Sequence, residues 1–248
     1  MAERVSTQSP EVMSVLEHLQ ELRQRLTKAV IALILCSLVS FFFSKRILVF
    51  LLSPMGDYPV IAPRPTTSIS IFMKISLLMG VILATPFMAY QFLRFVTPGL
   101  TRRERRSLLW IIPGITISFL GGAAFAYFVM VPAAIPFLLG FLSDVVEPTW
   151  MIDEYIPFVT SLVFWVGVSF EAPLLCYFLA WLGIVNAKAL LKGWRIAAIV
   201  IAILAAGITP TPDPFNMMLV MVPLLLLYFL GVFLAWIAGR QRRKRERP

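Results

Sequence analysis

The chain has 248 residues, of which 59% are hydrophobic and only 14% are charged, and its formal net charge is +9. This composition excludes a soluble domain of ordinary make-up and indicates a protein that crosses a membrane several times. The lysines and arginines lie almost wholly between or beside apolar runs, where membrane topology accounts for them, so we expect no nucleic-acid partner.

The first predicted element is an amphipathic helix in residues 1–28. Ser9, Pro10 and Glu11 are typical of a helix start, and apolar residues then repeat at helical spacing with charged residues on the other faces. His18 is the only histidine, and no cysteine or carboxylate cluster accompanies it at ligand spacing. We therefore predict no metal site and no cofactor.

Apolar runs predict six transmembrane helices, at residues 29–43, 69–96, 108–142, 155–182, 194–208 and 215–238. The first and the fifth are too short to cross about 30 Å of hydrocarbon unaided. Either the bilayer thins around them, or the helices gain length from flanking residues. The predicted fold class is all-α: a polytopic membrane protein with six transmembrane helices, both termini cytoplasmic and the last two spans short.

The charges of the connecting segments set the orientation. Residues 97–107 and 239–248 are basic, whereas residues 141–157 carry four acids and no lysine or arginine. By the positive-inside rule, both termini lie in the cytoplasm and the acidic loop lies outside. The predicted organisation is a cytoplasmic N-terminal helix (1–28), a six-span domain (29–238) and a basic cytoplasmic tail (239–248).

Three local patterns refine this outline. Four prolines between residues 54 and 65 predict a compact, irregular cap outside the membrane. The long third span either projects beyond the bilayer or is broken at Pro132 and Pro136. Residues 121–124, with the sequence GGAA, suit close packing of helices.

Two acids stand apart from the general pattern. Glu104 is bracketed by four arginines in the stretch Tyr90 to Arg106, but no arginine lies three or four residues away, so helical spacing leaves it available for another cation. An ordinary basic loop is the alternative explanation. Glu171 lies well inside the fourth span, where an acid costs about 2.5 to 3.5 kcal/mol. It is either a structural carboxyl within the bundle or a functional group.

Five segments, in order along nearly the whole chain, resemble signature segments of the TatC family, the polytopic subunits of the twin-arginine protein translocase. They are HLQELRQRL before the first span, PFMAYQFLRFVTPGLTRRERR after the second, FAYFVMVPAAIPFLLGF in the third, VGVSFEAPL in the fourth and GITPTPDPFN between the last two. No single segment is decisive, but the ordered set is highly specific.

The resemblance implies a receptor, and not an enzyme, that binds the twin-arginine signal peptides of folded precursor proteins. It further implies the single-span TatA and TatB subunits as partners, a homo-oligomer within the complex, export driven by the proton-motive force, and a bacterial-type cytoplasmic (inner) membrane. Glu21 and Glu104 would receive the two arginines, while Arg23 and Phe95 would shape the same surface. Arg25, four residues after Glu21, could pair with it until a signal arrives.

The resemblance also implies a set of partner-contacting or intramembrane polar positions, namely Glu171, Gln91, Asp213 and Pro86. The chain departs from the family pattern at Leu93, where tryptophan is expected, and at Asn216-Met217, which replaces a Ser-Gln pair. The alternative function is a proton-coupled small-molecule transporter that uses Glu171, which predicts an enclosed polar cavity around that residue.

Overall fold

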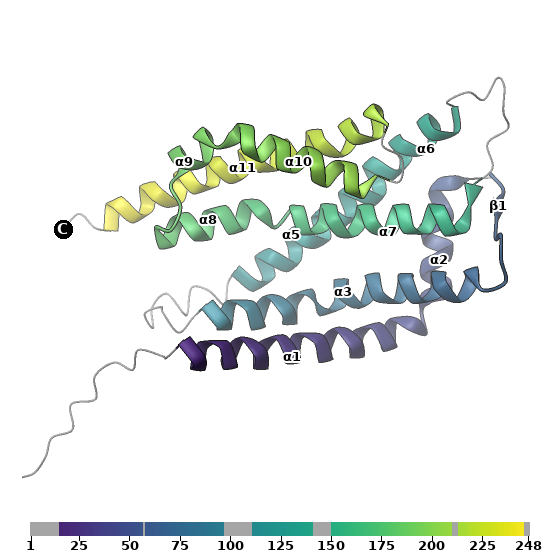
Figure 1. Ribbon diagram of the computed structural model, residues 1–248, viewed down its shortest axis with the longest axis horizontal. Helices are drawn as coiled ribbons and strands as arrows, with labels where there is room; N and C mark the ends of the chain where they lie inside the picture. The colour runs from purple at the N-terminus through teal and green to yellow at the C-terminus, as the bar shows by residue number, and fades with distance from the viewer. Residues whose placement is uncertain (1–14, 57, 97–110, 141–149, 210–212, 246–248) are drawn as a thin grey trace, which may run out of the picture.

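The computed structural model describes residues 15–56, 58–96, 111–140, 150–209 and 213–245, which form an elongated bundle of helices (Figure 1). Five helical runs of 23 to 31 residues are long and apolar enough to cross a membrane, and a shorter apolar helix supplies a sixth crossing. The prediction of an all-α, polytopic membrane protein is confirmed. The helices are α1 (Val15–Phe41), α2 (Ser44–Leu52), α3 (Thr67–Val96), α5 (Ile111–Phe125), α6 (Val131–Gly140), α7 (Ile152–Ser169), α8 (Ala172–Leu182), α9 (Ala187–Lys192), α10 (Trp194–Ile208) and α11 (Pro214–Arg245).

The two ends of the bundle differ in what they carry. Figure 1 shows the start of α1, the ends of α3, α8 and α11, and helix α9 at one end, and α2 and β1 at the other. The basic segments of the sequence follow α3 and end α11, so the positive-inside rule assigns the first end to the cytoplasm. We call these the cytoplasmic end and the outer end.

The first span is longer than its predicted bounds. Helix α1 runs for 27 residues without a break, and its apolar part covers Leu19–Phe41. From Val15 onward, the predicted amphipathic helix and the first span are therefore one helix, and the span gains its length from the preceding turns. The predicted helix start at Ser9 lies outside the described residues. Because nothing in the helix marks residue 28, the border of the N-terminal cytoplasmic segment stays a prediction.

The last two spans differ in length. Helix α10 has 15 residues and is short, as predicted, but α11 has 32 residues and its apolar part alone covers Pro214–Arg242. The prediction that both are short is wrong for the sixth span. Pro223 lies within α11 without ending it, and the basic residues that follow the apolar part continue the helix, since cations at a helix C-terminus are favoured by its dipole.

The third span is not broken at its prolines. It continues from α5 through a π-helical turn (Ala126–Met130) into α6, and the backbone N–H of Val131 donates to the carbonyl of Ala126. This widened turn comes directly before Pro132, which lacks an N–H and cannot continue the regular α-helical pattern. The local irregularity therefore takes the form of a π turn and not of a break.

The outer cap is compact, as predicted, but it is partly helical and not wholly irregular. It comprises α2, a 3-10 turn (Ser53–Met55) and strand β1 (Val60–Ile61), which pairs in parallel with β2 (Trp150–Met151). The Tyr127 hydroxyl donates to the carbonyl of Phe50, and the Tyr155 hydroxyl donates to that of Leu51 at 2.8 Å. Two spans thus hold the cap through its backbone.

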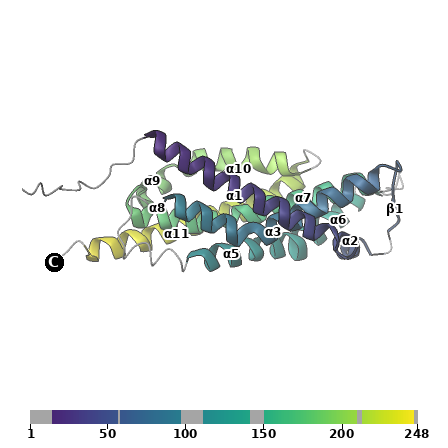
Figure 2. The same cartoon turned by 90° about the horizontal axis from the view of Figure 1, so that it is seen from below.

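The helices approach one another closely at glycines. A Cβ on Gly80 of α3 would overlap the Ser37 hydroxyl of α1 and come within 2.8 Å of the Ser37 Cα. A Cβ on Gly122 of α5 would lie 2.9 Å from the Cα of Gly167 in α7. Gly122, within the small-residue segment 121–124, is thus used for close packing, as predicted. Helix α1 packs mainly along α3, as Figure 2 shows, so its other faces stay open.

Candidate functional site

A polar group joins α1 to α3 near the cytoplasmic end. The Arg25 guanidinium contacts one oxygen of Glu21, with Nη2 to Oε1 at 2.7 Å and Nε to the same Oε1 at 3.3 Å. Arg25 Nη1 also donates to Oε1 of Gln91, one turn before the end of α3, at 3.4 Å. Glu21 and Arg25 lie four residues apart on the same face of α1, which lets them pair. Arg25 therefore bridges an acid of α1 and an amide of α3.

The Glu21 carboxylate is only half satisfied. Its second oxygen, Oε2, is buried and accepts no hydrogen bond from the residues that the structure describes. The side chains of Glu21 and Arg25 are only 17% and 16% exposed, so water shields the pair little. A buried acceptor without a donor costs about 1 to 3 kcal/mol. Oε2 of Glu21 can therefore accept one more hydrogen bond, and a cationic donor forms the strongest one.

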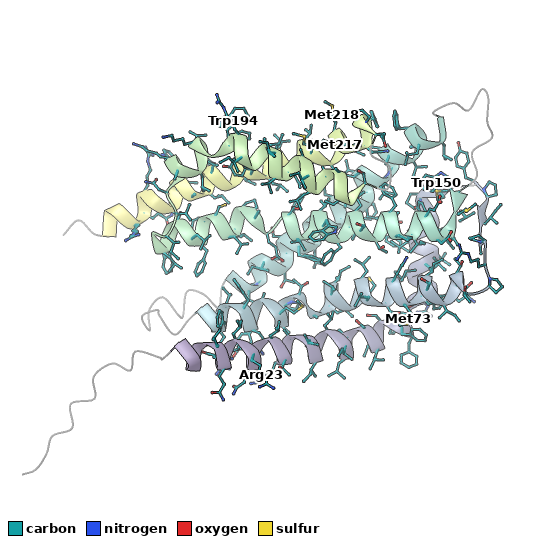
Figure 3. All side chains as sticks on the ribbon, viewed as in Figure 1. Arg23, Met73, Trp150, Trp194, Met217 and Met218 are labelled. Carbon is teal, nitrogen blue, oxygen red and sulfur yellow. The ribbon has the colours of Figure 1, made fainter. Side chains whose placement is uncertain are left out.

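The other predicted residues of this surface lie in three different settings. Arg23 is exposed on the side of α1 away from α3, as Figure 3 shows, since two residues along a helix turn the side chain by about 200° from Glu21. Phe95 is half-buried near the end of α3, where the neighbouring Arg94 donates to the Tyr90 hydroxyl at 3.1 Å. Glu104 lies outside the described residues.

Glu171 lies where the fourth span changes from α7 to α8. Pro173 is the second residue of α8, and it lacks a backbone N–H to donate. The backbone N–H of Glu171 donates to the Val168 carbonyl, which is the tighter i to i−3 spacing. The Ser118 hydroxyl of α5 donates to the neighbouring Phe170 carbonyl at 2.7 Å. No described residue forms an ion pair with the Glu171 carboxyl, Lys74 included.

Asp213 lies at the start of α11, and Pro86 lies within α3. Asp213 caps α11: its Oδ1 accepts from the backbone N–H of Asn216 and its Oδ2 from the Asn216 side-chain amide, both at 2.8 Å. Asn216 is 1% exposed, so the residue that departs from the family pattern completes the cap. Pro86 is exposed on α3 and lies inside that helix.

The four residues predicted as partner-contacting or intramembrane polar positions lie at different places in the bundle, and their contacts with partners stay predictions. Gln91 joins Glu21 and Arg25, Glu171 lies within the span, and Asp213 lies at the far end of α10 and α11. Sequence reasoning missed the contact of Gln91 with Arg25, because the two residues are 66 positions apart and no local pattern links them. The neighbouring Arg94–Tyr90 pair, in contrast, follows from i, i+4 spacing.

Neither of the two cavities described among the residues of α8 to α11 is the enclosed polar cavity that a small-molecule transporter would need around Glu171. Of two cavities on this side of the bundle, neither is lined by Glu171. The one that passes its neighbours Ser169 and Ala172 is lined almost wholly by apolar side chains between α8, α10 and α11. The described residues thus give the alternative function no support.

Comparisons with known proteins give one consistent result. The family model described as "TatC: Sec-independent protein translocase protein (TatC)" matches residues 17–223. The chain is 38% identical to the Sec-independent protein translocase protein TatC of Aquifex aeolicus over 94% of this chain and 98% of the relative. It is 36% identical to the protein of the same name from Synechocystis sp., over 92% and 90% respectively.

A solved structure agrees with the sequence relatives. It is titled a crystal structure of the twin arginine translocase receptor TatC, and it matches with a TM-score of 0.83 and 36% identity over 90% of this chain and all of that chain. The resemblance drawn from five short segments is confirmed over the whole length of the bundle. The chain belongs to the TatC family of Sec-independent protein translocase proteins.

Proposed function

We propose that the chain is the receptor and core component of a twin-arginine protein translocase, and that Glu21 receives an arginine of the signal peptide. The observation that carries the proposal is the buried Oε2 of Glu21, which accepts no hydrogen bond from any described residue. Guanidinium supplies several donors in a rigid fork and stays charged, so it satisfies such a carboxylate better than an ammonium does. The matching receptor structure and the named relatives support the assignment of the chain as a translocase receptor.

The remaining parts of the proposal follow from the family. The chain binds twin-arginine precursor proteins at its cytoplasmic end, assembles with TatA- and TatB-like single-span subunits and further copies of itself, and lies in a bacterial-type cytoplasmic membrane. Glu104 completes the arginine site. Glu171, in the turn between α7 and α8, contacts partner spans. The chain performs no reaction of its own; the proton-motive force drives export.

Photo-crosslinking of a signal peptide tests the arginine site. A photoreactive amino acid at Leu22, which is 41% exposed, and another at Thr101 should both crosslink to a peptide with paired arginines. The same peptide with paired lysines should crosslink about tenfold less, because lysine does not reproduce two-point binding. The matched control probe is at Ile203, a 67% exposed residue of α10. Equal crosslinking of the two peptides at Leu22 and Thr101 would contradict the proposal.

The ion pair within α1 gives a second prediction. Arg25→Gln removes the cation that already occupies Oε1 of Glu21, so the arriving arginine no longer competes with it. We expect the affinity for the arginine-pair peptide to rise about tenfold, which corresponds to the roughly 1.5 kcal/mol that a hydrogen bond between charged groups contributes where water shields it little. Fluorescence anisotropy of a labelled peptide measures the change.

The control for Arg25→Gln is Lys28→Gln. Lys28 is an exposed cation one turn further along α1, so its loss changes the net charge equally without touching Glu21. Its affinity should stay within about twofold of the parent chain. If both variants shift the affinity alike, Arg25 acts only through general charge, and its proposed competition for Glu21 is wrong.

A further inference from the structure

A cavity of about 400 Å³ lies at the cytoplasmic end, between the end of α8, the start of α9 and the last turns of α11. Its lining includes three cations, Lys188, Arg240 and Arg242, all with exposed side chains. None of the described residues that line it is an acid. The volume falls within the range of small-ligand pockets. The cavity therefore presents concentrated positive charge at the edge of the membrane.

Gly183, at the end of α8, is one of the residues that line this cavity. Helix α8 ends there with a left-handed backbone (φ 79°), and the backbone N–H of Ile184 donates to the Leu179 carbonyl at 3.0 Å. A Cβ on Gly183 would overlap the Arg242 guanidinium, so only glycine lets this side chain lie across the helix end. Gly183 therefore leaves room for the Arg242 guanidinium at the cavity wall.

The other two cations are also positioned. The Asn186 side chain accepts from the backbone N–H of Lys188 at 3.2 Å and fixes the first turn of α9. The Arg240 guanidinium lies 3.7 Å from the centre of the Trp236 ring, a cation–π contact that holds it at the rim. Tryptophan at the end of a span is typical of the level of lipid head groups.

An apolar groove continues the site toward the middle of the membrane. It has a volume of about 570 Å³, lies between α8, α10 and α11, and shares Val185 with the cationic cavity. Along α11 it is lined by Leu224, Leu227 and Tyr228, two to three turns before Trp236. A molecule with an anionic head and an apolar chain fits this succession of cations, tryptophan and apolar wall.

We propose that this cavity binds the phosphate of an anionic phospholipid from the cytoplasmic leaflet, with an acyl chain of the same lipid along the groove. Topology alone requires basic residues in these segments but does not require them to surround one cavity. Basic pockets between helices on the cytoplasmic side are suited to anionic head groups. The site is independent of signal binding, because Glu21 and Gln91 lie on α1 and α3.

Native mass spectrometry of the full chain in detergent tests the proposal, with phosphatidylglycerol and phosphatidylcholine as probes. The parent chain should bind one phosphatidylglycerol about 150-fold more tightly than phosphatidylcholine, as expected for three cations near a lipid surface. Lys188→Gln/Arg240→Gln should keep only about a fivefold preference, from the remaining Arg242. If the parent chain binds the two lipids equally, the proposal is wrong, and this result requires no variant.

The control is Lys192→Gln/Arg195→Gln, which removes two exposed cations of the same end that do not line the cavity. It should keep the preference for phosphatidylglycerol; if it loses the preference as the first variant does, the cavity has no special role. Competition with inorganic phosphate tests whether the cavity binds a free anion and not the head group of a lipid. If phosphate alone binds the parent chain and displaces the lipid at equal concentration, the cavity is a free-anion site and the lipid assignment is wrong.

Discussion

Glu21→Gln is expected to lower the affinity for a twin-arginine signal peptide about 100-fold, or about 2.7 kcal/mol. Glutamine keeps the shape of the side chain but removes the charge, and its amide group offers donors where the arriving guanidinium needs an acceptor. Arg25, which now contacts Oε1 of Glu21 at 2.7 Å, would then face the incoming arginine as an unpaired cation. Isothermal titration with arginine-pair and lysine-pair peptides measures the loss.

Two controls separate this effect from a general change of charge. Glu154→Gln removes an acid from the first turn of α7 at the outer end and should leave the affinity unchanged. In the Glu21→Gln background, Arg25→Gln should relieve the repulsion by the unpaired cation but should not restore the parent affinity, because no carboxylate remains to receive the arginine. An unchanged affinity in Glu21→Gln would remove Glu21 from the site, whatever the family resemblance implies.

The sequence predicted the number and order of the crossings, because apolar length and loop charge are local properties. It did not predict where the helices begin and end. The first span extends backward to Leu19 because the same helix continues across the predicted border at residue 28. The sixth begins at a cap made by Asp213 and Asn216, and a capping contact depends on side-chain geometry that hydropathy does not contain.

The candidate site was predicted in part. The family resemblance placed Glu21 at the cytoplasmic end, and helical spacing gave its pairing with Arg25, which the structure confirms. Neither the family resemblance nor helical spacing could predict that Gln91 contacts Arg25, because that contact depends on how α1 and α3 pack along each other. The close approach of Gly80 to Ser37 brings these helices together. The buried state of Oε2 likewise depends on tertiary packing.

Gly122→Leu is the substitution with the largest expected effect on stability. A Cβ at this position would lie 2.7 Å from Cγ of Phe170 and 2.9 Å from the Cα of Gly167, so α5 and α7 would have to separate. Overpacking of this kind costs about 3 kcal/mol. We expect the thermal unfolding midpoint in detergent to fall by roughly 10 °C, measured by scanning fluorimetry. The displaced Phe170 precedes Glu171, so the turn of the fourth span would move as well.

Gly121→Leu is the matched control, since a Cβ there would meet nothing within 4 Å. Leucine is a better helix former than glycine, so this variant should be neutral or slightly stabilising, by up to about 0.8 kcal/mol. Adding Phe170→Ala to Gly122→Leu should restore only part of the lost stability, because it removes the clash with the ring but not the one with the Gly167 backbone. Equal midpoints for the two leucine variants would show that the α5–α7 contact is looser than the structure requires.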